Sequence, residues 1–554
     1  MVTMRLLSKK IFFSLSVLEL LYLSIWWIFM IAIWSRMLVF DGTHYWAGFV
    51  NIWGDWSAHI IYVMNFAYRS LILPHHPLYV GEPFRYHFVA DLLSGVLMRS
   101  GATLIQATIL PSIILSIFLV TAAYLFYRSV FNSRAVAMVS CLLFFFNGGL
   151  GFIYAFVFFV RNDSRLYNYP PLFQLTHIES ENIQIINFIA DIFIPQRSFL
   201  LGMPITIFIL LFLWNVYVRR LTSLPNGSWI MAAFVIGLMP LIHFNSFLVI
   251  LIVGASVTIY EFFNSHTFSY RWLIFYSIIG IIASPALLYL TQNAPQRFFR
   301  FSPLWMTNGN LLSWVWFWIK NIGIMAVLIP ESIGVVPKRI RVMYIPFLLL
   351  FIASNLIVFQ SYEWDNRKYI LYWYFFSSGM VGYMMVLFFR RGSATVKNVI
   401  LFLVGLAIVS GSVDAANLTR FEYQKFRLFS IDDLKFSKYV RQLTDKDAIF
   451  LTAPTNSWFS ITLGRQVVMG LTFWMHTAYG FDTEAREAEI TKIYEGSKDM
   501  YALLDKYHVD FVVIGDRERE TIPDVNETFY RSRFPVFMHN ADTVIYDVRE
   551  TWSQ

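Results

Sequence analysis

The chain has 554 residues, of which 57% are hydrophobic, 19% aromatic and only 14% charged. Its mean hydropathy is +0.56, and soluble domains do not have this composition. The net charge of +8 comes from the apolar part of the chain, where it indicates loop orientation and phosphate contact rather than nucleic-acid binding. Cys141 is the only cysteine, which excludes an internal disulfide and a cysteine metal cluster.

Long apolar stretches recur along the first 414 positions, and many reach the roughly 18 residues that cross about 30 Å of hydrocarbon. The first, from Ile11 to Leu38, is too long for a signal-peptide core and lacks a small-residue cleavage site, so we expect a retained anchor. We predict an α-helical polytopic membrane protein with about 13 spans. They lie at 11–38, 57–73, 84–99, 104–127, 135–160, 199–218, 229–243, 245–263, 271–291, 311–329, 342–359, 369–389 and 396–413.

Clusters of Lys and Arg between these stretches predict which side of the membrane is cytoplasmic. By this rule the N-terminus is cytoplasmic, and the unusual polar loops lie on the outer side together with the tail. The basic residues assigned to the cytoplasmic side are Arg5, Lys9, Lys10, Arg128, Arg134, Arg219, Arg220, Lys338, Arg339, Arg341, Arg390, Arg391 and Lys397.

The pattern changes after residue 414. Residues 1–414 carry 26 Lys and Arg against 14 Asp and Glu, whereas residues 415–554 carry 17 against 21. In the tail we predict strands at DAIFLTAP and GRQVVMG, helices at TEAREAEITKIY and SKDMYALLDKYH, and a buried strand at VDFVVIGD. No G-x-G-x-x-G or Walker loop follows these strands. We therefore predict a transmembrane domain over 1–414 and a soluble, extracytoplasmic α/β domain over 415–554 that has a structural or substrate-positioning role.

Four ionisable residues follow the first span in the aromatic-rich segment DGTHYWAGFVNIWGDWSAHI, namely Asp41, His44, Asp55 and His59. Ionisable groups at a membrane boundary are functional candidates. A carboxylate there can act as a general base on an acceptor hydroxyl, or as a ligand to a divalent cation that bridges a phosphate. Both roles suit Asp41 or Asp55, and a helix after Gly54 would put Asp55 and His59 on one face. The alternative is that the aspartates cap helices and the histidines are structural.

The segment PHHPLYVGEPFRYHFVAD, residues 74–91, combines turn-forming Pro and Gly with polar side chains, so we expect an extended loop before a short helix. Arg85 would offer a planar fork to phosphate oxygens. Tyr86 and His87 would add hydrogen bonds, and Asp91 lies at the entry of the next span. Interfacial residues whose polar ends reach water are the alternative.

Two further outer loops contain candidates for phosphate contact. The loop 161–197 is long enough to indicate function, and Arg197 at its end is either a phosphate ligand or a membrane-edge anchor. The stretch WDNRK at 364–368 sets charges directly against an apolar span, which is costly unless they face a cavity or pair with one another. Lys368 would bind a lipid phosphate there with Asp365 close to it; a self-paired loop is the alternative.

These features together resemble the GT-C superfamily of integral-membrane glycosyltransferases, which use polyprenyl-phosphate sugars and include mannosyl- and arabinosyltransferases. The resemblance is architectural: an acid-bearing first outer loop, an extended Pro/Tyr segment, many spans and a small outer α/β domain. It implies that Asp55 or Asp41 acts as base or metal ligand, and that Arg85, Arg197 or Lys368 contacts the carrier phosphate. The first loop has no adjacent acidic pair, which leaves open both the base and the need for a divalent cation (Mg or Mn).

We therefore expect a glycosyltransferase that moves a sugar from a polyprenyl-phosphate carrier to a lipid, glycan or protein acceptor at the outer membrane face. A transporter or flippase of lipid-linked glycans, which binds the same ligand without chemistry, is the alternative. Transporters often have related halves; none are visible here, and the polar residues gather at one surface, which favours the enzyme. A scaffold that displays the tail is a third hypothesis, and it predicts scattered outer acids.

Overall fold

The computed structural model describes residues 15–49, 52–161, 174–219, 224–291, 299–307 and 309–551. The chain packs into two compact units. Unit 1 comprises residues 1–36, 112–292 and 298–424, and unit 2 comprises residues 37–111, 293–297 and 425–554. The first outer segment and the tail thus belong to one unit. The predicted domains, 1–414 and 415–554, stay predictions.

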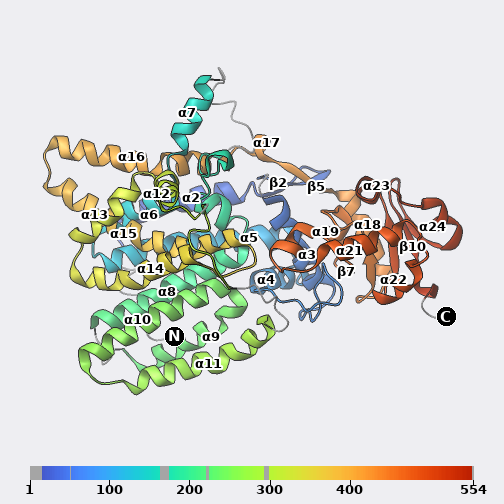
Figure 1. The fold of residues 1–554 in the computed structure, drawn as a ribbon, viewed down its shortest axis with the longest axis horizontal. Helices are drawn as coiled ribbons and strands as arrows, with labels where there is room; N and C mark the ends of the chain where they lie inside the picture. The colour runs from blue at the N-terminus through green and yellow to red at the C-terminus, as the bar shows by residue number, and fades with distance from the viewer. Residues whose placement is uncertain are drawn as a thin grey trace. The chain divides into compact units, whose positions relative to one another are not determined.

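Unit 1 is a helical bundle in which α8, α9, α10 and α11 lie side by side (green in Figure 1). Its elements are α2 (Val17–Trp34), α5 (Leu104–Val130, which begins in unit 2), α6 (Arg134–Phe145), α7 (Gly151–Arg161), η2 (Glu179–Glu181), η3 (Ile189–Phe193), α8 (Arg197–Arg219), α9 (Asn226–Ile242), α10 (Phe244–Ser265), α11 (Tyr270–Thr291), β3 (Arg300–Phe301), α12 (Leu311–Ile322), α13 (Met325–Val335), α14 (Lys338–Leu356), β4 (Ile357–Val358), η5 (Glu363–Asn366), α15 (Arg367–Arg391), α16 (Ala394–Asn417) and α17 (Phe421–Gln424).

Eight helices in the described parts of the chain are long and apolar enough to cross a membrane, or nine if the pair α12 and α13, bent by 89°, is one span. The protein is therefore an integral membrane protein. The predicted count of about 13 spans is not confirmed. The predicted spans 57–73 and 84–99 fall on α3 (Trp53–Tyr68) and α4 (Val89–Arg99), which have only 16 and 11 residues.

The stretch predicted as one span at 135–160 is broken into α6 and α7 by the sequence Asn147-Gly-Gly-Leu-Gly151. A Cβ atom added at Gly149 would overlap the carbonyl oxygen of Lys320, and one added at Gly151 would overlap that of Leu175. The Leu150 N–H donates to the Lys320 carbonyl at 2.7 Å. The helix ends here because its backbone packs directly on the backbone of neighbouring segments, which only glycine permits.

A buried carboxylate near the start of α2 joins three helix ends of unit 1. Glu19 accepts a hydrogen bond from Tyr124 at 2.8 Å and lies 3.1 Å from both Arg128 and Arg134. A second contact joins α8 and α14: the Tyr217 hydroxyl near the end of α8 donates to the carbonyl of Arg339 at the start of α14, at 3.2 Å. Arg128, Arg134 and Arg339, which the charge rule placed on one side of the membrane, thus lie at helix ends that contact neighbouring helices. Arg5, Lys9, Lys10 and Arg220 lie outside the described residues, and which side is cytoplasmic stays a prediction.

The described part of the loop predicted to be the third outer loop, residues 174–196, is held by polar side chains that project from the bundle. Asp414 on α16 accepts hydrogen bonds from the Leu175 and Thr176 N–H groups, each at 2.8 Å, and from the Thr176 hydroxyl at 2.7 Å. Asn321 on α12 accepts from the Gln184 N–H at 2.6 Å. Buried backbone N–H groups need hydrogen-bond acceptors. The side chains of Asp414 and Asn321 supply them for this loop and so fix it to unit 1.

Unit 2 combines a three-stranded sheet, β1-β2-β5, with a five-stranded sheet of order β7-β6-β8-β10-β9. Its elements are β1 (Leu38–Phe40), β2 (His44–Ala47), α3, α4, β5 (Phe426–Ser430), α18 (Ile431–Leu443), β6 (Ile449–Leu451), α19 (Trp458–Leu463), β7 (Gln466–Val467), α20 (Thr472–Thr477), α21 (Thr483–Tyr494), α22 (Met500–Lys506), β8 (Phe511–Ile514), α23 (Asp516–Thr521), α24 (Glu527–Arg533), β9 (Val536–His539), β10 (Val544–Asp547) and η6 (Arg549–Thr551).

The tail and the first outer segment are joined through backbone pairing. β2 pairs antiparallel with β5 of the tail. The extended segment predicted at 74–91 runs beside β7, with the Val467 N–H donating to the Pro77 carbonyl at 2.9 Å and the Val80 N–H to the Val468 carbonyl at 3.1 Å. The tail therefore packs directly on the segment that carries the predicted site.

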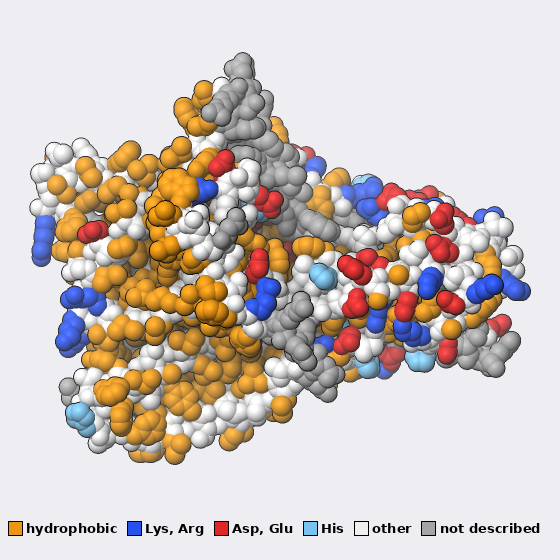
Figure 2. Space-filling model, viewed as in Figure 1, with side chains coloured by type: hydrophobic (Ala, Val, Ile, Leu, Met, Phe, Trp, Pro, Cys, Tyr) orange, Lys and Arg blue, Asp and Glu red, His pale blue; other side chains and the backbone are white. Residues whose placement is uncertain are grey.

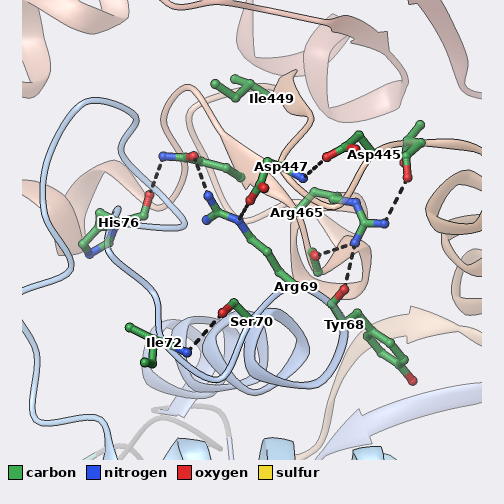
Figure 3. Close-up of polar contacts among 12 residues, drawn as sticks. Tyr68, Arg69, Ser70, Ile72, His76, Asp445, Asp447, Ile449 and Arg465 are labelled. Carbon is green, nitrogen blue, oxygen red and sulfur yellow. Dashed lines mark hydrogen bonds and ion pairs between the residues drawn. The ribbon is translucent and has the colours of Figure 1, made fainter.

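Buried arginines bind the C-terminal end of α3 to the tail (Figure 3). Arg69 donates to Asp447 at 3.1 Å and to Gln466 at 3.2 Å. Arg465 donates to the Tyr68, Gly464, Arg441 and Thr444 carbonyls at 2.9 to 3.3 Å. Carbonyls at a helix C-terminus lack intrahelical partners and attract cations, so Arg465 helps to fix α3 against the tail.

We expect Arg465→Met to lower the stability of unit 2 by about 3 kcal/mol, because four carbonyl groups lose a buried donor. The measurement is the thermal unfolding midpoint of the purified protein. Arg517→Met is the matched control, since Arg517 pairs with Glu520 on the exposed surface at 2.8 Å and such a pair contributes at most about 1 kcal/mol. Equal midpoints for the two variants would contradict this account of α3.

Side chains of different kinds cover the two units. Hydrophobic side chains spread over the visible face of the helices α8 to α11 in Figure 2, whereas Lys, Arg, Asp and Glu alternate over the helices of the tail. The exposed apolar side chains of unit 1 include Phe234, Phe263, Ile281, Leu288 and Phe402. The apolar surface of unit 1 is typical of a bundle that faces lipid. The charged surface of the tail is typical of a domain that faces water.

Candidate functional site

The helix α3 carries two of the predicted site residues. It begins at Trp53, directly after the aromatic segment, and Asp55 lies in its first turn, where the helix dipole favours a negative charge. His59 follows four residues later, so both side chains project from one face, as predicted from their spacing. Asp55 is partly buried and His59 is almost fully buried.

His59 is paired with another predicted site residue. Its Nδ1 lies 2.8 Å from Oδ2 of Asp91 in the first turn of α4, and both side chains are buried. A carboxylate only accepts hydrogen bonds, so in the neutral imidazole this contact places the proton on Nδ1 and the lone pair on Nε2. Nε2 is buried without a hydrogen-bond partner among the described residues. The pair thus orients an imidazole whose second nitrogen can bind a ligand.

Aromatic rings surround this pair. The Tyr86 ring centroid is 6.2 Å from that of His59 and 5.3 Å from that of Tyr62. From the tail, Trp474 lies edge-on to His59 at 6.5 Å, and the Tyr479 hydroxyl is 3.0 Å from the Tyr62 hydroxyl. Aromatic walls with a few polar groups are the usual surroundings of a bound small molecule.

The Asp41 carboxylate is held in a tight turn. It follows β1 in the turn before β2, and its carboxylate accepts from the N–H groups of His44 and Thr43 at 2.8 Å each, from the Thr43 hydroxyl at 2.8 Å and from the Trp46 indole at 2.7 Å. These hydrogen bonds, with that from His44 the largest effect, hold the pKa of Asp41 well below its usual range. Such a carboxylate is a weak base, which argues against Asp41 as the group that accepts a proton.

The other polar residues of the first two segments have local partners. The Arg85 guanidinium donates to Glu82 at 2.9 Å and stacks over the Phe481 ring. The His87 ring stacks on Tyr86 with centroids 4.3 Å apart. His44 Nδ1 lies 3.0 Å from the Thr43 hydroxyl, in the turn that Asp41 stabilises. Their predicted roles in substrate binding stay predictions.

A second buried histidine, His76, belongs to the same region. Its Nδ1 accepts from the Leu78 N–H at 3.1 Å, and the rings of Tyr479, Phe84, Tyr62 and Phe481 surround it. Burial, together with the charge of Arg85, lowers the pKa of His76 to about 3. The sequence analysis did not select this residue, although the His-His pair between two prolines was a visible signal.

The pKa of His76 predicts how stability depends on pH. An unfolded histidine binds a proton near pH 6.5, whereas His76 stays neutral down to about pH 3. The stability is therefore full above about pH 6.5 and decreases as the pH falls toward 3, by up to about 1.4 kcal/mol per pH unit. The measurement is the thermal unfolding midpoint at pH 7.5 and at pH 5.0. We expect this midpoint to fall less between the two pH values for His76→Gln, which retains an acceptor for the Leu78 N–H, than for the wild type. Parallel pH profiles would contradict this.

Three predicted site residues lie in unit 1. Arg197 is the first residue of α8 and is buried. Lys368 in the first turn of α15 is also buried, and its Nζ lies 3.0 Å from Asp365. Arg367 next to it donates to the Gln184 carbonyl of the outer loop at 3.0 Å. Lys368 and Asp365 thus form a local ion pair in unit 1, and their predicted contact with a carrier phosphate stays a prediction.

The described residues contain no group of three or more His, Cys, Asp or Glu side chains placed to hold a metal ion. The carboxylate of Asp41 is already engaged in its turn, and Asp55 alone does not make a ligand set. Among the described side chains the predicted divalent cation therefore has no ligand set.

The tail does not offer an open nucleotide crevice at the ends of its parallel strands β6 and β8. The buried Glu518 accepts from the Ala453 N–H after β6 at 2.8 Å and from the Gly515 N–H after β8 at 2.9 Å. In α/β sheets this is the position where ligands usually bind. Here the Glu518 carboxylate occupies that position.

Comparisons with known proteins found matches among solved structures. No family model matches the sequence, and no curated protein matches it. The archaeal oligosaccharyltransferase AglB from Archaeoglobus fulgidus, in complex with an inhibitory peptide and a dolichol-phosphate, aligns at 12% identity over 91% of this chain and 70% of that chain, with a TM-score of 0.45. The Archaeoglobus fulgidus enzyme tethered with an acceptor peptide containing the NVT sequon aligns at 12% identity over 95% and 74%, with a TM-score of 0.49.

The apo form of the Archaeoglobus fulgidus oligosaccharyltransferase gives the same identity, 12%, over 90% of this chain and 70% of that chain, with a TM-score of 0.45. All three of these structural neighbours are structures of the oligosaccharyltransferase from Archaeoglobus fulgidus.

Proposed function

We propose that the protein is a GT-C-type membrane glycosyltransferase that moves a sugar from a polyprenyl-phosphate carrier to a lipid, glycan or protein acceptor at the outer face of the membrane. The observation that carries the proposal is the arrangement on α3 and α4: Asp55 in the first turn, His59 one turn later, and Asp91 at 2.8 Å from His59. A partly buried carboxylate beside an oriented imidazole and aromatic rings suits proton transfer next to a bound sugar.

The chemistry is a direct displacement at the anomeric carbon. Asp55 takes the proton from the acceptor's attacking group, which forms a bond to the anomeric carbon. The bond from that carbon to the phosphate oxygen breaks, and its electron pair leaves with the polyprenyl phosphate. The configuration at the anomeric carbon inverts. A cationic side chain stabilises the departing phosphate, and Arg85, Arg197 and Lys368 are the candidates.

Asp55 is favoured over Asp41 for the base on electrostatic grounds. The turn hydrogen bonds keep the pKa of Asp41 low, so it would hold a transferred proton poorly. Asp55 lies in the first turn of α3, on the helix face that also carries His59.

The experiment that tests the proposal detects a glycosylated product. The purified protein is incubated in lipid nanodiscs with polyprenyl-phosphate hexoses and a panel of lipid, glycan and peptide acceptors, and the acceptors are analysed by mass spectrometry. We expect one acceptor to gain the mass of a hexose residue. A flippase would move the donor across liposome membranes and leave every acceptor unmodified, which would reject the enzyme hypothesis.

A further inference from the structure

A tail residue lies at the start of the helix that carries the proposed base. A Cβ atom added at Gly54, the residue before Asp55, would lie 3.3 Å from Nε1 and 3.5 Å from Cδ1 of Trp474. Gly54 therefore leaves room for the edge of this indole. Trp474 is on α20, 419 positions along the chain from Asp55, and it is only partly buried.

The same indole reaches the imidazole of His59. The two ring centroids are 6.5 Å apart at an interplanar angle of 73°. His59 is 2% exposed, and its Nε2 has no hydrogen-bond partner among the described residues. A buried nitrogen that lacks a partner costs free energy, and a ligand hydroxyl in that position would remove this cost. This observation is independent of the position of Trp474.

The residue types match the chemistry of a sugar ring. A pyranose has an apolar face of C–H groups that packs on an aromatic ring, and hydroxyl groups at its rim that need donors and acceptors. Trp474 offers the aromatic surface, Asp55 offers acceptors, and His59 Nε2 offers an acceptor that Asp91 holds in place. If Trp474 served only to pack the tail on α3, nothing would explain why Nε2 of His59 is buried without a hydrogen-bond partner among the described residues.

We propose that Trp474 is the aromatic wall of a hexopyranose-binding subsite whose polar partners are Asp55 and Nε2 of His59. The tail then contributes directly to substrate binding. This inference rests on the proposed function in one respect, namely that the bound ring belongs to the transferred or accepting sugar. Binding of the ring itself needs no transfer step, so the two can be tested separately.

The test measures sugar binding without catalysis. Saturation-transfer NMR is recorded for the full-length protein in nanodiscs with methyl glycosides of mannose, glucose and galactose and with N-acetylglucosamine. We expect saturation of the ring C–H protons of at least one of them. Trp474→Ala should weaken that binding at least tenfold and Trp474→Phe much less. Phe473→Ala is the matched control, because Phe473 is the exposed neighbour on the same short helix.

Several outcomes would overturn the subsite. Equal binding by Trp474→Ala and wild type would do so, and so would a lack of saturation transfer from wild type to every sugar. If Trp474→Ala does not fold, Trp474→Leu keeps the apolar contact with Gly54 but has no aromatic face, and it should show the same loss. Wild type that binds a sugar through Trp474 but makes no product would reject the proposed function and leave the subsite standing.

Discussion

Asp55→Asn is expected to lower the rate of sugar transfer by about a thousandfold, because a general base contributes about 10²- to 10⁴-fold. Asparagine has nearly the same shape and cannot accept the proton from the acceptor. Its amide stays at the first turn of α3, where the aspartate also lies. The measurement is the initial rate of product formation by protein in nanodiscs at saturating donor.

The control for this prediction is a pair of variants with opposite expectations. Asp41→Asn should retain most of the activity, because the amide oxygen of asparagine can still accept the turn hydrogen bonds from Thr43 and His44. Asp55→Glu should retain part of it, since a carboxylate remains. The Asp55 variants should unfold within a few degrees of the wild type. A fully active Asp55→Asn together with an inactive Asp41→Asn would assign the base to Asp41 instead.

Gly149→Ala is expected to destabilise unit 1 by about 4 kcal/mol or more, which is among the largest effects of single substitutions. The added methyl group would overlap the carbonyl oxygen of Lys320 and approach Asn321. Both are backbone atoms that cannot turn away as a side chain does. Asn321 also binds the outer loop at Gln184, so a shift of α12 would disturb that loop as well.

The measurement is the yield of monodisperse protein and its thermal unfolding midpoint. Gly405→Ala in α16 is the matched control, because nothing lies within 4 Å of a Cβ atom at that position and alanine favours a helix over glycine by about 1 kcal/mol. The control should therefore be as stable as the wild type or more so. A Gly149→Ala protein with an unchanged midpoint would show that the junction between α6 and α7 is not as tightly packed as described.

The sequence predicted the local features of the fold well. The stretch TEAREAEITKIY coincides with α21 (Thr483–Tyr494), and VDFVVIGD contains the buried strand β8. The spacing of Asp55 and His59 correctly indicated one helix face. Each of these inferences depends on periodicity within about a dozen residues, which is the range over which side chains of one element share a surface.

The parts that the sequence did not predict depend on contacts between distant positions. His59 and Asp91 are 32 positions apart, and their pairing requires α3 and α4 to pack against each other. Trp474 reaches Gly54 only because the tail packs on α3. The break at 147–151 was missed because an apolar stretch with three glycines still reads as one span. A glycine in the sequence can indicate a close approach of two backbone segments, but the sequence does not show which distant segment lies against it.

The central claim is that the protein breaks the bond between a sugar and its polyprenyl phosphate. The most direct measurement uses a donor labelled with ¹⁴C in the sugar and ³H in the polyprenyl chain, incubated with the protein and the acceptor panel in nanodiscs. Our account predicts that the two labels separate with the wild type, the ¹⁴C passing to an acceptor and the ³H remaining in free polyprenyl phosphate, and that they stay together with Asp55→Asn. Labels that stay together with the wild type and every acceptor, while the intact donor crosses liposome membranes, would contradict it.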